Sequence, residues 1–148
     1  MFYLSILKIF SPNIMNEHPV LKKKDPSVDI IMPNYNKDQF LKEAIDSVLN
    51  QKYNNWKLII IDGASQDNSR KILVEFEKKF NNINIIYLRK RKNTAFARNL
   101  GIRLSRAEYV AFLDSDDYWS KNKLREQINF MKQFDYDFTY TDYVPFLL

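Results

Sequence analysis

The stretch Tyr-Val-Ala-Phe-Leu-Asp-Ser-Asp-Asp, residues 109–117, passes from an apolar run into three carboxylates. The run is short, aromatic and partly β-branched, which favours a buried strand that ends at the aspartates. Carboxylates this close repel one another, so they indicate a bound cation or a solvated acidic turn before a helix. In an extended segment, Asp114 and Asp116 would point to the same side and could share one Mg²⁺ or Mn²⁺.

The composition is typical of one globular domain. The chain has 148 residues, of which 45% are hydrophobic and 28% are charged, and it has no cysteine, so disulfides are excluded. Its net charge of +5 favours an anionic partner such as a nucleotide, a nucleic acid or a membrane surface. Charge alone suggests a nucleic acid, and no basic-aromatic or recognition-helix pattern supports one, so we expect no nucleic-acid binding.

Residues 1–27 are predicted to form a leader that precedes the folded domain at residues 28–148. Three prolines punctuate this leader, and its apolar run 2–10 is a poor signal peptide because it contains Lys8 and lacks a cleavage site. No apolar run approaches the roughly 20 residues that cross a bilayer. We expect a loosely ordered or membrane-touching leader and a cytoplasmic protein, with peripheral contact to the inner membrane face left open.

Hydrophobic periodicity predicts strands and helices in alternation. The predicted strands are 28–32, 58–61, 83–88, 109–113 and 137–140, and the predicted helices are 40–49, 72–80, 94–105 and 120–134. This alternation implies a Rossmann-like α/β fold, with a mainly parallel sheet covered by helices on both faces. In such sheets, ligands bind beyond the carboxyl ends of the strands.

Polar residues follow three of these strands and are expected to meet at one edge of the sheet. Tyr35 could stack on a nucleotide base, and Asp62 could accept a hydrogen bond from a base imide or a ribose hydroxyl. The chain has only two glycines, so it contains no glycine-rich phosphate loop. If the chain binds a nucleotide diphosphate, a metal at the aspartates would have to neutralise the negative charge, together with Arg98 or the basic run 89–92. A solvated loop is the simpler interpretation of that run.

Five segments in this order resemble the family 2 glycosyltransferases, which have the GT-A fold. They are residues 28–36, 44–53, 58–67, 97–101 and the D-x-D signature 114–117. The resemblance implies an enzyme of polysaccharide biosynthesis that uses a divalent metal, Mn²⁺ or Mg²⁺. It would transfer a sugar, with inversion, from a nucleotide-diphosphate donor to a hydroxyl of a glycan or lipid-linked acceptor.

The resemblance also assigns roles to individual positions. Asp114 would face the ribose and the metal, and Asp116 would be the direct metal ligand. The residues implied to bind the nucleotide sugar are Pro33, Tyr35, Asn36, Asp62, Arg98 and Asp114.

The sequence departs from the family pattern at two positions. Gly63 stands where many members have a second aspartate, which leaves the base preference open. Ala107 stands where many have a glycine, and a left-handed residue there would be strained by roughly 1–2 kcal/mol, so the turn should be built differently.

Family domains continue past the position of Leu148, where the resemblance puts the acceptor site and the general base. We therefore identify no catalytic base and expect the donor-binding half of a glycosyltransferase. Such a half would expose apolar surface and a sheet edge. A separately encoded C-terminal half is a candidate partner. Two alternatives stay open. One is a non-catalytic remnant that binds nucleotide or nothing. The other is a phosphohydrolase of the haloacid dehalogenase type, with Asp114 as nucleophile and Asp116 as acid/base.

Overall fold

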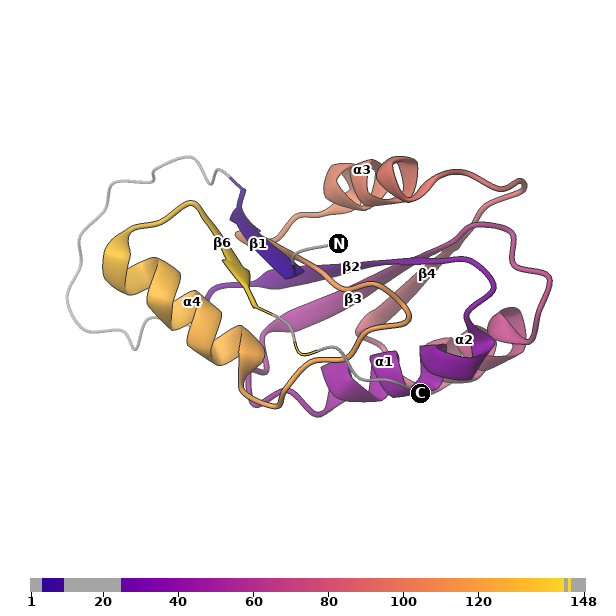
Figure 1. Ribbon diagram of the computed structural model, residues 1–148, viewed down its shortest axis with the longest axis horizontal. Coiled ribbons are helices and arrows are strands. Elements are labelled where there is room, and N and C mark those ends of the chain that lie inside the picture. Colours follow the sequence, from indigo (N-terminus) through magenta and orange to yellow (C-terminus); the bar gives the residue numbers. More distant parts are fainter. Residues whose placement is uncertain (1–3, 10–24, 143, 145–148) are drawn as a thin grey trace.

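The computed structural model describes residues 4–9, 25–142 and 144, and is built around one six-stranded sheet (Figure 1). The strands are β1 (Leu4–Lys8), β2 (Val28–Asn34), β3 (Trp56–Asp62), β4 (Ile83–Tyr87), β5 (Tyr109–Phe112) and β6 (Phe138–Thr141), in the order β4-β3-β2-β5-β1-β6. Strands β2 to β5 pair in parallel, and β1 pairs antiparallel with β5 and β6. The predicted α/β fold with a mainly parallel sheet is confirmed.

Helices cover both faces of this sheet, as predicted. They are α1 (Asp38–Leu49), α2 (Ser69–Lys79), α3 (Thr94–Leu104) and α4 (Lys123–Phe134). Figure 1 shows α3 on one side of the sheet and α1 and α2 on the other. Buried residues of α4 belong to the same core as those of α1 and α2, whereas α3 covers a second, smaller core.

The alternation of side chains along each strand explains the two cores. On β2, Ile30 and Met32 join the core beneath α1, whereas Ile31 joins the core beneath α3. On β3, Ile60 and Ile61 divide between the two cores in the same way. Strands buried on both faces become almost continuously apolar, which is why these runs could be recognised in the sequence.

Strand β1 shows that the prediction of a loosely ordered leader is wrong for Leu4–Lys8. Ile6 is 0% exposed and is paired with Ala111 of β5 on one side and Thr139 of β6 on the other. The segment is apolar enough to fill the gap between these two strands, but both partners are far away along the chain, so no local pattern reveals the pairing. Residues 1–3 and 10–24 of the predicted leader lie outside the described residues.

The turn between α3 and β5 is built without a left-handed residue at Ala107, as expected. The buried carboxylate of Asp29 accepts hydrogen bonds from the Ser105 hydroxyl at 2.7 Å and from the backbone N–H groups of Arg106 at 3.0 Å and Ala107 at 3.3 Å. Because one carboxylate satisfies these donors, the helix can end without a glycine.

Two groups of exposed aromatic residues lie at the end of the sheet that carries β6. Phe130, Phe134 and Tyr136 contact one another, with ring centroids 4.8–5.8 Å apart, and Phe138 and Tyr140 are exposed on the edge strand. Thr139 between them bonds to Gln127 of α4, so Phe138 and Tyr140 point to the other face of the sheet. We call these five residues, on both faces of the edge, the aromatic edge surface. It agrees with the expected exposure of apolar surface and of a sheet edge. Within the described residues, no helix is long and apolar enough to span a membrane.

Candidate functional site

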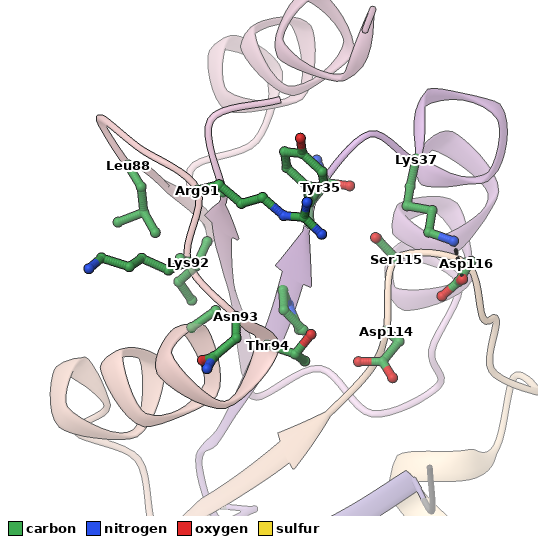
Figure 2. A pocket seen from close by; sticks show the side chains of 15 residues that line it. Tyr35, Lys37, Leu88, Arg91, Lys92, Asn93, Thr94, Asp114, Ser115 and Asp116 are labelled. Carbon is green, nitrogen blue, oxygen red and sulfur yellow. Dashed lines mark ion pairs between the residues drawn. The ribbon is translucent and has the colours of Figure 1, made fainter. Parts of the chain in front are cut away.

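A pocket of about 400 Å³ opens at the carboxyl ends of β2, β3 and β5. Residues that follow each of these strands line it: Tyr35 after β2, Gly63 after β3, and the acidic turn after β5. The predicted convergence of three strand ends is therefore confirmed. Figure 2 shows the start of α3 and the loop before it forming the opposite wall.

The predicted site residues fall into two groups around this pocket. Pro33, Tyr35, Asp114 and Asp116 line it directly. Asn36, Asp62 and Arg98 are not among the lining residues, and each instead makes a hydrogen bond or ion pair that positions a lining segment.

Asp62 does not line the pocket but holds the lining residue Asn34 by a hydrogen bond. Its side chain is buried, and Oδ1 accepts hydrogen bonds from Asn34 Nδ2 at 2.9 Å and from the Ser65 hydroxyl at 2.6 Å. Asn34 lines the pocket, and its Oδ1 is buried without a hydrogen-bond partner. An orphaned buried acceptor is unfavourable unless a donor arrives. Asn34 was not predicted as a site residue, although its position at the carboxyl end of β2 is where such residues are expected.

Asn36 ties the loop after β2 to the loop after β3. Its φ of 51° lies in the left-handed region, which asparagine tolerates better than most residues. Its N–H donates to the Ser65 hydroxyl at 3.0 Å, and its Oδ1 accepts from the Gln66 N–H at 2.8 Å. These bonds fix the chain directly after Tyr35.

The acidic segment after β5 forms a turn, as in the alternative of an acidic turn before a helix, and is not extended. The strand ends at Phe112, and the Asp117 N–H donates to the Asp114 carbonyl at 3.0 Å. The backbone turns here because this hydrogen bond takes the place of strand pairing beyond the sheet. Asp114 and Asp116 nevertheless both line the pocket.

Each of these two carboxylates has its own cation. Arg98 Nη2 lies 2.7 Å from Asp114 Oδ1 and 2.9 Å from Oδ2, and Lys37 Nζ lies 2.7 Å from Asp116 Oδ2. The neighbouring Asp117 is less well compensated. Burial, followed by the charges of Asp116 and Asp114, raises the pKa of its carboxyl against the opposing effect of Lys37.

The donor chemistry of this turn fits a hard divalent cation. Carboxylate oxygens are the ligands that Mg²⁺ and Mn²⁺ prefer, and the Lys37 ammonium already places a positive charge against one of them. Among the described residues, no group of three or more His, Cys, Asp or Glu side chains is arranged to hold a metal ion. A metal held by Asp114 and Asp116 would thus need further ligands from a nucleotide or water.

The basic loop between β4 and α3 contributes Arg91 and Lys92 to the pocket lining. The run 89–92 was given as a candidate source of cations for a diphosphate, with a solvated loop as the simpler interpretation. The Arg91 guanidinium lies 4.4 Å from the centroid of the Tyr35 ring (Figure 2). The run follows β4, a parallel neighbour of β3, so its position at the end of a strand was the available signal.

Comparison with known proteins identifies the family. The family model for "Glycosyl transferase family 2" matches residues 29–146. TuaG of Bacillus subtilis (strain 168), a glycosyltransferase assigned to teichuronic acid biosynthesis, is 40% identical over 118 residues, which are 80% of this chain and 47% of TuaG. The glucosyltransferase WfgD of Escherichia coli is 40% identical over 119 residues, or 80% of this chain and 46% of WfgD. The chain thus spans about half the length of these relatives.

Solved structures share the fold. Residues 1–349 of TarS from Staphylococcus aureus superpose with a TM-score of 0.67 at 24% identity, covering 72% of this chain and 32% of that one. The mannosyltransferase PcManGT of Pyrobaculum calidifontis gives 0.68 at 22% identity, covering 74% and 33%. These likenesses establish the GT-A architecture that the sequence resemblance implied. With the family match over most of its length, the chain belongs to glycosyl transferase family 2.

Proposed function

We propose that this chain is the donor-binding half of a glycosyltransferase, and that the pocket binds the nucleotide-diphosphate part of a sugar donor. The observation that carries the proposal is the pocket itself, where an aromatic ring, two aspartates and several cations meet at the ends of three parallel strands. Related proteins support it. WfgD is named as a UDP-Glc transferase acting on a diphosphoundecaprenol acceptor, and TarS was solved with UDP and with UDP-GlcNAc.

In this proposal the nucleotide base stacks on the Tyr35 ring, beside Pro33. The Arg91 guanidinium lies over that ring in the structure. When the base stacks there, the guanidinium moves away and, together with Lys92, pairs with the diphosphate. Asp62 orients Asn34, whose unpartnered Oδ1 is a suitable acceptor for a base imide N–H. Asn36 holds both loops in place.

The acidic turn serves the leaving diphosphate. Asp114 and Asp116 would hold a divalent ion, Mn²⁺ or Mg²⁺, which would supply positive charge to the diphosphate oxygens, and PcManGT was solved with GDP-Man and Mn²⁺. Arg98 fixes the Asp114 carboxylate through two hydrogen bonds. These groups favour cleavage of the bond between the anomeric carbon and the diphosphate.

The transfer step joins the acceptor oxygen to the anomeric carbon from the side opposite the diphosphate, so the configuration inverts. The bond to the diphosphate breaks, and the acceptor proton passes to a general base. We assign no described residue to that role. The acceptor, a glycan or a lipid-linked sugar at the inner face of the membrane, and the base would belong to the further half that the relatives' length implies. That half, in the same or a separate polypeptide, would cover the aromatic edge surface.

Calorimetric titration of the protein with UDP and with GDP, each with and without Mn²⁺, tests the donor site. We expect binding of at least one nucleotide diphosphate, strengthened by Mn²⁺ and weakened in Tyr35→Leu, which keeps an apolar side chain but removes the ring. The exposed Tyr118→Leu variant is the matched control, since Tyr118 is not among the pocket-lining residues. Absence of binding to any nucleotide diphosphate at millimolar concentration would contradict the proposal.

A second candidate is a remnant that binds nucleotide without turnover. The chain spans about half the length of TuaG and WfgD, and we assign no general base among the described residues. The family match favours glycosyl transfer over the phosphohydrolase alternative. Release of UDP from UDP-sugars by the purified chain would exclude the remnant, and binding without release would support it.

A further inference from the structure

Lys37 combines a fixed backbone with a movable charged group. Its carbonyl accepts hydrogen bonds from the N–H groups of Phe40 at 3.0 Å and Leu41 at 2.9 Å, and its own N–H donates to the Ser69 hydroxyl at 3.3 Å. Its side chain, by contrast, is 40% exposed and lines the pocket. The ammonium can therefore change position without disturbing the start of α1.

The two ion pairs of the acidic turn differ in how firmly they are held. Arg98 contacts both oxygens of Asp114, and these side chains are 25% and 18% exposed. Lys37 contacts one oxygen of Asp116, and these side chains are 40% and 41% exposed. A partly buried arginine whose Nη2 reaches both carboxylate oxygens is held more firmly than an exposed lysine that reaches one oxygen. The Lys37–Asp116 pair is thus the one that can separate when a ligand arrives.

The Lys37 ammonium stands where a metal bound to Asp116 would interfere with it. Its Nζ is 2.7 Å from Asp116 Oδ2, and Figure 2 shows the pair at the mouth of the pocket. A divalent ion bound to this same oxygen would repel the ammonium strongly, so the ammonium would leave Oδ2 when the ion binds there. A diphosphate in the same pocket offers the displaced ammonium a new anionic partner.

We propose that the Lys37 ammonium takes the place of the metal at Asp116. It neutralises this carboxylate when no divalent ion is bound, and it moves to the donor diphosphate when a divalent ion binds. This inference rests on the proposed function, because it assumes that the pocket takes a nucleotide diphosphate. If so, binding of the divalent ion and binding of the nucleotide are coupled. The ion binds weakly alone and more tightly with nucleotide, since the diphosphate offers the displaced ammonium an anionic partner.

Titration with Mn²⁺ alone, followed by the electron paramagnetic resonance signal of free Mn²⁺, tests the first part. We expect Lys37→Met to bind Mn²⁺ about threefold or more tightly than wild type, because no ammonium competes for Asp116. Lys37→Arg, which keeps the charge, should behave like wild type. Lys42→Met is the matched control, because Lys42 lies on the same helix, is exposed and pairs with Asp46 away from the pocket.

The same titration with saturating UDP tests the coupling. We expect UDP to tighten Mn²⁺ binding in wild type, and Lys37→Met to lose most of that gain. Equal or weaker Mn²⁺ binding by Lys37→Met in the absence of nucleotide, or no Mn²⁺ binding by any variant, would overturn the inference. If wild type binds Mn²⁺ but neither UDP nor any other nucleotide diphosphate, the proposed function fails, whereas the comparison with Mn²⁺ alone still decides whether Lys37 competes for Asp116. Circular dichroism of each variant confirms that it is folded.

Discussion

Gly101 of α3 lies directly against Ile31 of β2, so closely that a β-carbon on the glycine would stand 2.5 Å from Ile31 Cγ2. The helix therefore packs on the sheet at a distance that only glycine permits. Because α3 also carries Arg98, this contact sets how far the guanidinium stands from Asp114. A feature of the core thus positions part of the site.

Gly101→Ala should destabilise the protein by about 1–3 kcal/mol, because Ile31 is fully buried and cannot move away. The overlap outweighs the gain of about 1 kcal/mol that alanine brings to a helix interior. Urea unfolding followed by circular dichroism measures the change. Arg103→Ala, at an exposed position of the same helix, is the control and should change little. A variant as stable as wild type would show that the packing is looser than described.

Asp29→Asn should destabilise the turn after α3. The donors of Ser105, Arg106 and Ala107 all bond to one oxygen, Asp29 Oδ2, and asparagine can offer an oxygen there only without the negative charge that strengthens these bonds. We expect a loss of about 1–3 kcal/mol in the free energy of unfolding. Asp25→Asn, at an exposed position, is the control. Equal stability of the two variants would mean that the Asp29 carboxylate is dispensable.

Lys123→Met should stabilise the protein at neutral pH. The Lys123 ammonium is buried without a hydrogen-bond partner, 3.8 Å from the centroid of the Trp119 ring, and burial lowers its pKa to about 7. The unfolded chain keeps the ordinary pKa of 10.5 and so binds more protons than the folded chain between these values. Stability of the wild type should therefore rise as pH increases from about 7 towards 10.5, with the full penalty present below about 7.

In Lys123→Met this rise should be absent, and the advantage over wild type should be largest at or below neutral pH and shrink as pH rises. Urea unfolding at several pH values between about 6 and 9.5 provides the measurement. Lys121→Met is the control, since Lys121 is exposed and two positions away. Parallel pH profiles for wild type and Lys123→Met would exclude a depressed pKa.

Arg91→Ala should weaken UDP binding by about three- to tenfold, because the pocket loses a cation that, in the proposed function, pairs with the diphosphate. Arg91→Lys should lose less, since it keeps the charge for the diphosphate. Calorimetry with UDP measures both. Arg89→Ala removes the same charge from the same loop outside the pocket lining, so equal effects at positions 89 and 91 would mean that only net charge matters.

The elements between β2 and β6 were predictable because their patterns are local. The helix predicted at 94–105 is α3 (Thr94–Leu104), and the strand predicted at 28–32 is β2 (Val28–Asn34). Strand β1 was not predictable, because its pairing depends on distant strands. Within the site, Tyr35 and Asp116 could be placed at one edge of the sheet from topology alone. The contacts of Lys37 with Asp116 and of Arg91 with Tyr35 could not be predicted, because they depend on the path of the loops and on side-chain rotamers.

The position of β1 has a consequence for the order in which the protein can be completed during synthesis. Ile6 leaves the ribosome roughly a hundred positions before its partner Ala111. The first strand must therefore wait, apolar and unpaired, while the parallel units form, and only then can it join β5 and receive β6. That interval exposes a segment able to pair with other chains, so yield in the cell should depend on how quickly translation reaches β5 and β6.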